Sequence, residues 1–207
     1  MTGLDRMLEF EASGREIADY YRFGVETPEK WGLLRAAGLR FGLRTLVETG
    51  GYHGGTMEFL QVDFDRLVTI ELGSALFDDI YALGIPNVLC LKGDSGRVLA
   101  QFLLFFSDPA LFWLDAHPSG GDTVGVPTGG VDGRVYGTVF AEELMAVLDR
   151  GNKMDVVFVD DVGHPGIERD FIGAIVGRYD GWELRFCGDF PNCIGMVTFR
   201  GRLGEDP

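Results

Sequence analysis

The chain has 207 residues, the length of one domain, and 46% of them are apolar, enough for a sizeable core. Its formal net charge is −14 and its lysines and arginines are scattered, which disfavours nucleic acid and anionic membranes as partners. No apolar run reaches the roughly 18 residues that a membrane span needs. The opening MTGLDRMLEFEASGRE is acidic and lacks an apolar stretch, so we expect no signal peptide and a cytoplasmic protein.

Strand-like and helix-like segments alternate along most of the chain. Residues 1–44 are expected to form one or two helices, which serve as a cap or as a dimer surface. Buried strands are expected at 45–50, 66–72, 87–94, 110–116 and 155–161. Helices are expected between them, with Ser74, Ser95 and Thr138 as N-caps, and another is expected around Ile167 and Phe171.

This alternation predicts a parallel sheet covered by helices on both faces. The expected strands are apolar throughout, as such a buried sheet requires. The runs 182–190 and 193–201 are joined by a short turn, which indicates an antiparallel hairpin. We therefore predict an α/β, Rossmann-like, doubly wound and mostly parallel sheet with a C-terminal antiparallel hairpin. This domain would span 45–207 and follow the helical extension 1–44.

A glycine-rich turn, ETGGYHGGT at 48–56, follows the first expected strand. Its glycines allow the backbone to approach a ligand closely. The dinucleotide fingerprint GxGxxG does not fit, because Tyr52 stands where its second glycine should be, and a P-loop lacks its lysine. The spacing that fits is Glu-x-Gly-x-x-x-Gly at Glu48, Gly50 and Gly54. Tight packing of a strand on a helix explains one such turn about equally well.

A second acid, Glu71, ends the next expected strand, about 20 residues after the glycines. A carboxylate at this place can accept hydrogen bonds from both hydroxyls of a ribose. The alternative for Glu71 alone is a solvated residue at a strand end. Together with the glycine turn, its position favours ribose binding.

The segments VETGGYHGGT, TIEL and KGDS resemble the first three motifs of class I S-adenosylmethionine-dependent methyltransferases, over roughly 45–161. FWLDAH followed by VFVDD is similar to bacterial macrocin-type O-methyltransferases, which use a divalent metal. The resemblance implies that S-adenosylmethionine is the cofactor. It also implies that Glu48 and Gly50 line the methionine portion of this cofactor, and that Glu71 holds the ribose.

The same resemblance places Asp94 and Ser95 at the adenine edge. Tyr52 and Gly54 belong to the turn that it assigns to the cofactor. Many members of the family have glycine where this chain has Tyr52, so we expect the turn to follow a slightly different path.

Acids also end the fourth and fifth expected strands, as Asp115 and as the pair Asp160 and Asp161. Adjacent parallel strands lie about 4.8 Å apart, so these carboxylates can converge. Clustered acids repel one another unless a cation joins them, and oxygen ligands suit Mg²⁺, Mn²⁺ or Ca²⁺. We expect a metal site, with Mg²⁺ as the candidate ion. The alternative is that Asp160 and Asp161 merely end a strand and cap the next helix.

The chain has three histidines, His53, His117 and His164, all in loops after expected strands. Histidine suits general-base catalysis near neutral pH, although a lone surface histidine is usually idle. His117 and His164 follow the strand-end aspartates closely in sequence. We therefore take Asp115, His117 and His164 as the candidate catalytic residues.

Together these features predict methyl transfer from S-adenosylmethionine to a small-molecule acceptor, at oxygen, with help from a divalent metal. The glycine-rich segment 117–137 is a candidate lid or acceptor-specificity loop. Two alternatives stay open: an oxidoreductase that binds NAD or a nucleotide-sugar, and a non-catalytic cofactor-binding or assembly protein on the same fold. The sequence leaves the acceptor unidentified, and a homodimer is an option.

Overall fold

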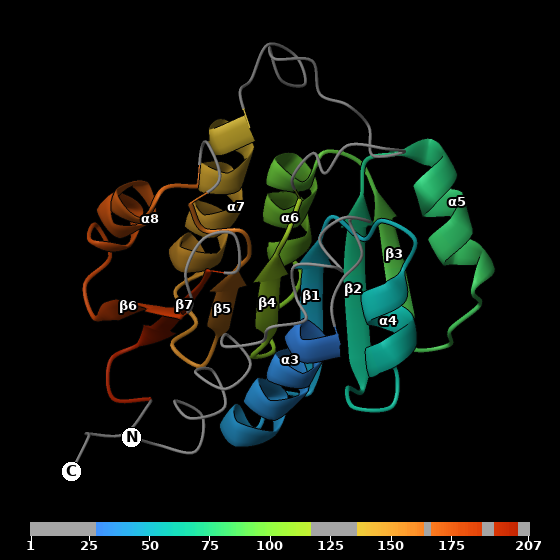
Figure 1. Cartoon of the computed structure of the whole chain (residues 1–207), viewed down its shortest axis with the longest axis horizontal. Coiled ribbons are helices and arrows are strands. Elements are labelled where there is room, and N and C mark those ends of the chain that lie inside the picture. Colours follow the sequence, from blue (N-terminus) through green and yellow to red (C-terminus); the bar gives the residue numbers. More distant parts are fainter. Residues whose placement is uncertain (1–27, 117–135, 164–166, 188–192, 203–207) are drawn as a thin grey trace.

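The computed structural model describes residues 28–116, 136–163, 167–187 and 193–202. Within these residues, seven strands form one sheet in the order β3-β2-β1-β4-β5-β7-β6 (Figure 1). The strands are β1 (Thr45–Thr49), β2 (Arg66–Glu71), β3 (Val88–Lys92), β4 (Leu111–Leu114), β5 (Val156–Val159), β6 (Trp182–Cys187) and β7 (Ile194–Phe199). Neighbours among β1–β5 are parallel, whereas β7 is antiparallel to both β5 and β6. The predicted fold class, with its C-terminal hairpin, is confirmed.

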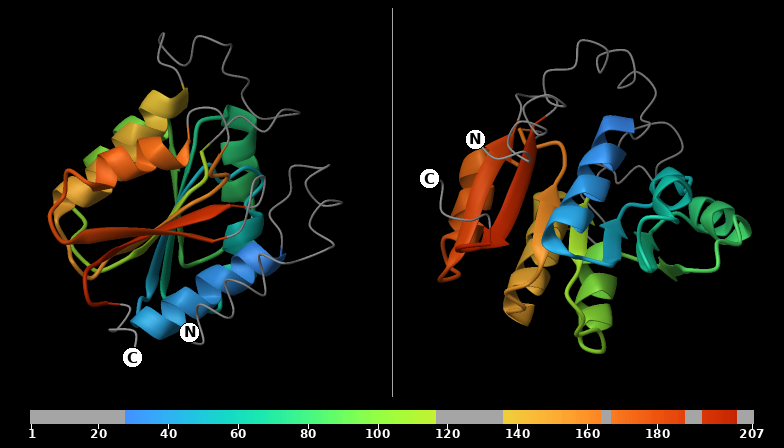
Figure 2. Two further views of the ribbon diagram at one scale, coloured as in Figure 1. Left: turned by 60° about the vertical axis from the view of Figure 1, so that its left-hand side comes forward. Right: turned by 90° about the horizontal axis from the view of Figure 1, so that it is seen from below.

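Helices cover both faces of this sheet (Figure 2). They are α3 (Pro28–Phe41), α4 (Gly55–Leu60), α5 (Ser74–Ala82), α6 (Ser95–Leu103), α7 (Tyr136–Arg150) and α8 (Arg169–Val176). The first three lie on one face and the last three on the other. The chain after β1 therefore turns to one face, through α4, and the chain after the adjacent β4 turns to the other, through α7. In open α/β sheets this divergence opens a ligand crevice at the carboxyl ends of the two strands.

Two apolar layers form the core, one on each face of the sheet. Val47 and Phe112 belong to the layer under α6, α7 and α8, and Leu46 and Trp113 belong to the layer under α3 and α4. Alternating residues of one strand thus point to opposite layers, as the period of two requires. The central strands are almost entirely buried, whereas the edge strand β3 is partly open, with Leu89 45% exposed. The expectation of strands buried on both faces therefore holds for the centre of the sheet but not for β3.

Helix α3, the first of the described helices, is part of this core. Its side chains Leu33, Leu34, Ala37 and Phe41 are buried against the sheet. The division at residue 44 and the homodimer stay predictions, and residues 1–27 lie outside the described part of the chain. No described helix combines the length and apolar character needed to cross a membrane.

The predicted helix caps are wrong by a short shift. The N-cap positions of α5 and α6 are Gly73 and Asp94, so Ser74 and Ser95 are the first helical residues. Helix α7 begins before Thr138. For α6 the reason is tertiary, because the Ser95 hydroxyl bonds to a buried glutamate of α7 rather than to its own helix.

Candidate active site at the strand ends

The glycine turn after β1 passes directly against the chain that follows β4. Gly50 has φ 81°, and its N–H donates to the carbonyl of Ile70 at 2.9 Å. A Cβ on Gly50 would lie 2.7 Å from the Asp115 carbonyl oxygen and 2.8 Å from the Cα of Ala116. Both neighbours are backbone atoms that cannot move cheaply, so this position requires glycine.

Glu71 joins the loops that follow β1 and β2. Its Oε2 accepts the backbone N–H of Tyr52 at 2.9 Å, and its Oε1 accepts that of Gly73 at 2.6 Å. The side chain is nearly enclosed, since the residue is 6% exposed. A carboxylate has about four acceptor sites, so these two bonds leave capacity for two hydroxyls.

Tyr52 itself has φ 46°, a conformation that glycine adopts without strain. The structure thus shows why glycine would also suit this position.

Glu48 is more deeply buried than the resemblance suggests, at 1% exposure. Its Oε2 accepts the hydroxyl of Thr69 at 2.9 Å, directly across from it on β2. Next in this row, on β3, lies Cys90. Burial, helped by the negative charges of Glu71 and Glu48, raises the pKa of the Cys90 thiol to about 11. Glu48 therefore links β1 to β2 beneath the turn. Its contact with a cofactor stays a prediction.

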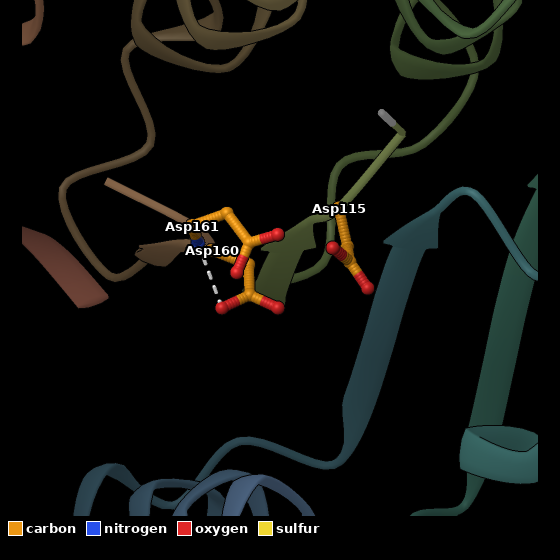
Figure 3. Close-up of side chains that lie close together, drawn as sticks. All are labelled: Asp115, Asp160 and Asp161. Carbon is orange, nitrogen blue, oxygen red and sulfur yellow. Dashed lines mark hydrogen bonds between the residues drawn. The ribbon is translucent and has the colours of Figure 1, made fainter. Parts of the chain in front are cut away.

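Three aspartates meet at the ends of β4 and β5 (Figure 3). Leu114 pairs with Val159, so the residues that follow them leave the sheet side by side. Each of Asp115, Asp160 and Asp161 offers a carboxylate oxygen, and these oxygens lie within 4.8 Å of one another. The predicted convergence is confirmed.

The local backbone turns the paired aspartates toward Asp115. Asp161 has φ 49°, and its N–H donates to Asp160 Oδ1 at 2.8 Å. The next helix, α8, has Glu168 at its N-cap position. The alternative that this pair caps the next helix is therefore wrong.

The carboxylate cluster has dimensions that suit a divalent cation. Oxygen ligands lie about 2.0–2.6 Å from Mg²⁺ or Ca²⁺, so two ligands on opposite sides of the ion are about 4–5 Å apart. The carboxylate oxygens of the three aspartates lie within 4.8 Å of one another, which agrees with this range. Asp160 and Asp161 are buried and Asp115 is partly buried, so their negative charges need compensation within the protein.

Known proteins resemble this chain in structure rather than in sequence. No protein-family model matches it, and no curated protein matches it closely in sequence. Among solved structures, the methyltransferase PaMTH1 of Podospora anserina, bound to S-adenosylhomocysteine (SAH), superposes with a TM-score of 0.62 at 12% identity, over 97% of this chain and 89% of that chain.

Two O-methyltransferases superpose similarly, each over 95% of this chain and 91% of its own. TomG of Streptomyces achromogenes, involved in tomaymycin synthesis and in complex with S-adenosylmethionine (SAM), has a TM-score of 0.60 at 16% identity. The enzyme of Bacillus cereus, in complex with SAH, has a TM-score of 0.59 at 15% identity. This chain has the class I SAM-dependent methyltransferase fold.

In this methyltransferase fold, a buried acid of α7 links the end of β1 to the start of α6. Glu143 of α7 is 2% exposed and lies within hydrogen-bonding distance of the hydroxyl of Thr49, 3.4 Å away, as well as bonding to Ser95. Burial raises its pKa to about 8, and the negative charges of Asp94 and Asp115 add to the shift, while the two hydroxyls oppose it. Among the described residues, its other oxygen, Oε1, has no hydrogen-bond partner.

The sequence interpretation overlooked Glu143, although a signal was present. The residue stands in the apolar stripe of α7, between Phe140 and Leu144, where an acid is unexpected. Asp94 and Ser95, predicted for the adenine edge, lie beside it at the start of α6.

Lys30 of α3 is a second residue that the sequence did not single out. Its ammonium forms an ion pair with Asp160 Oδ2, lies 3.9 Å from Asp161 Oδ1, and stands 5.8 Å from the centre of the Trp113 ring. Lys30 and Asp160 are 130 positions apart, so no local pattern could have linked them.

Of the three predicted histidines, His53 alone lies among the described residues. His53 is exposed and its Nδ1 lies 3.1 Å from Asp79 of α5, on the side of the sheet that carries β2 and β3. His117 and His164 lie outside the described residues, as does most of the glycine-rich segment, 117–135.

Proposed function

We propose that this protein transfers the methyl group of SAM to a hydroxyl of a small-molecule acceptor. The observation that carries the proposal is the position of Glu71, at the carboxyl end of β2 and bonded to the glycine turn, on a methyltransferase sheet. SAM, when bound, supplies a methyl group that its sulfonium already activates. The protein then has to align the acceptor and assist the loss of its proton.

Each strand end is assigned one part of the cofactor. Glu71 accepts the ribose hydroxyls, and the turn at Gly50 and Gly54 brings backbone close to the methionine portion, above Glu48. Asp94 and Ser95, at the start of α6, border the adenine. Tyr52, in the same turn as Gly50 and Gly54, is the remaining residue proposed to contact the cofactor.

The acidic cluster supports the finer proposal of a metal-assisted, macrocin-type O-methyltransferase. Asp115, Asp160 and Asp161 would hold the ion through oxygen, the ligand type that Mg²⁺ prefers. A divalent ion bound there would lower the pKa of an acceptor hydroxyl. His117 and His164 are the proposed alternatives for taking the proton.

A small acceptor agrees with the charge of the chain. The net charge of −14 opposes binding to nucleic acid. TomG, which is similar in structure, takes part in tomaymycin synthesis. We propose a hydroxylated small molecule as the substrate class.

Calorimetry of SAH binding tests the central assignment. A hydrogen bond to a charged group is worth about 1.5–3 kcal/mol, so Glu71→Ala should weaken SAH binding at least about tenfold while the protein stays folded. Glu58→Gln removes an exposed acid from α4 and is the matched control, which should bind SAH as the wild type does. Equal affinity of Glu71→Ala and wild type, or a wild type that binds NAD instead of SAH, contradicts the proposal.

A further inference from the structure

The ammonium of Lys30 already occupies the position of a cation at the aspartate cluster. Its side chain is 12% exposed, and it ion-pairs with Asp160, which is 1% exposed. Asp161 Oδ1 lies 3.9 Å from the same nitrogen. Two of the three proposed metal ligands are therefore in contact with a positive charge that belongs to the chain itself.

The two oxygens of Asp160 are used differently. Oδ1 accepts the backbone N–H of Asp161 at 2.8 Å, whereas Oδ2 is the oxygen that pairs with Lys30. Lys30 thus holds the oxygen other than the one that accepts the Asp161 N–H. An ion bound to this oxygen would sit next to the ammonium in a largely buried site, where like charges repel strongly.

We propose that Lys30 is an internal competitor for the divalent cation, so that the metal binds at Asp115, Asp160 and Asp161 only when the Lys30 side chain leaves them. This inference rests on the proposed function for the identity of the metal site. It goes beyond that function because it assigns the control of metal affinity to a residue of α3.

The displacement is a movement of one side chain rather than of the helix. Leu33, Leu34 and Phe41 anchor α3 in the core. The neighbouring Trp31 donates from Nε1 to the hydroxyl of Thr56 at 3.2 Å and stacks on Phe59. With the backbone of Lys30 fixed in this way, its flexible four-carbon side chain is the part able to swing away from the aspartates.

Direct titration with Mn²⁺, followed by electron paramagnetic resonance on the full chain without cofactor, tests the proposal. Lys30→Met should bind Mn²⁺ at least about tenfold more tightly than wild type, because the competitor is gone. Lys30→Arg keeps the positive charge and should bind as weakly as wild type. Lys153→Met, which removes an exposed lysine stacked on Phe199, is the matched control and should leave the affinity unchanged.

Thermal unfolding of the same variants provides a second measurement. In EDTA, Lys30→Met should have a lower Tm than wild type because its aspartates lose their counter-charge, and Mn²⁺ should raise its Tm more than that of wild type. Equal or weaker Mn²⁺ affinity of Lys30→Met, including no binding by either protein, overturns the proposal.

SAH calorimetry on these samples separates the two proposals. If Lys30→Met gains Mn²⁺ affinity but the protein does not bind SAH, the competition by Lys30 stands and the methyltransferase function is refuted.

Discussion

The buried carboxyl group of Glu143 should make the protein less stable as the pH rises. Burial raises its pKa from an ordinary 4.5 to about 8. Between these values the folded protein keeps the proton that the unfolded chain releases. Raising the pH therefore favours unfolding, and it does so until the folded-state pKa is passed.

Substitution by glutamine removes this dependence while keeping the shape of the side chain. Each pH unit in this range is worth about 1.4 kcal/mol, so the wild type should lose about 2–3 kcal/mol relative to Glu143→Gln between pH 5 and pH 7. All other titrating groups are common to both proteins and cancel in the difference.

Urea unfolding at pH 5, 6 and 7, followed by far-UV circular dichroism, measures this difference. Glu58→Gln, on the exposed side of α4, removes one carboxyl group from the unfolded chain as Glu143→Gln does, and it controls for that effect. A stability difference between Glu143→Gln and wild type that stays constant from pH 5 to pH 7 would refute the reasoning. It would mean that Glu143 is ionised and compensated in the folded protein.

Two further predictions concern the metal and the glycine turn. EDTA or Asp160→Asn should abolish methyl transfer and leave SAH affinity nearly unchanged. Methyl transfer at the full rate in EDTA would contradict the metal site and leave His117 or His164 as the group that removes the acceptor proton. Gly50→Ala should lower the free energy of unfolding by about 1–3 kcal/mol more than Gly42→Ala, because both have positive φ but only Gly50 lacks space for a Cβ. Equal losses in urea unfolding would contradict the proposed clash.

The order of elements was readable from the sequence because it depends on local periodicity. Apolar runs such as 110–116 and 155–161, separated by amphipathic segments, predict a parallel sheet, since each strand must hide both of its faces. The strand-end acids followed from the same argument. Once β4 and β5 are neighbours, Asp115 must lie near Asp160.

Local patterns failed where a distant residue decided the outcome. Ser95 looks like a helix cap, but the buried carboxyl group of Glu143 takes its hydroxyl. The helix α5 starts one residue earlier than its capping pattern indicates, with Gly73 as its N-cap, and the N–H of Gly73 is held by Glu71.

The sequence by itself determined the sheet, the glycine turn and the gathering of acids, because these depend on spacing along the chain and on the geometry of parallel strands. Only the tertiary structure decided how the acids are compensated. Lys30 reaches Asp160 from a helix packed on one face of the sheet, and Glu143 reaches Thr49, at the end of β1, from a helix on the other. Residues that meet through the packing of helices on a sheet have no fixed separation along the chain. Such contacts therefore cannot be read from sequence patterns and form only when the two helical layers pack on the sheet.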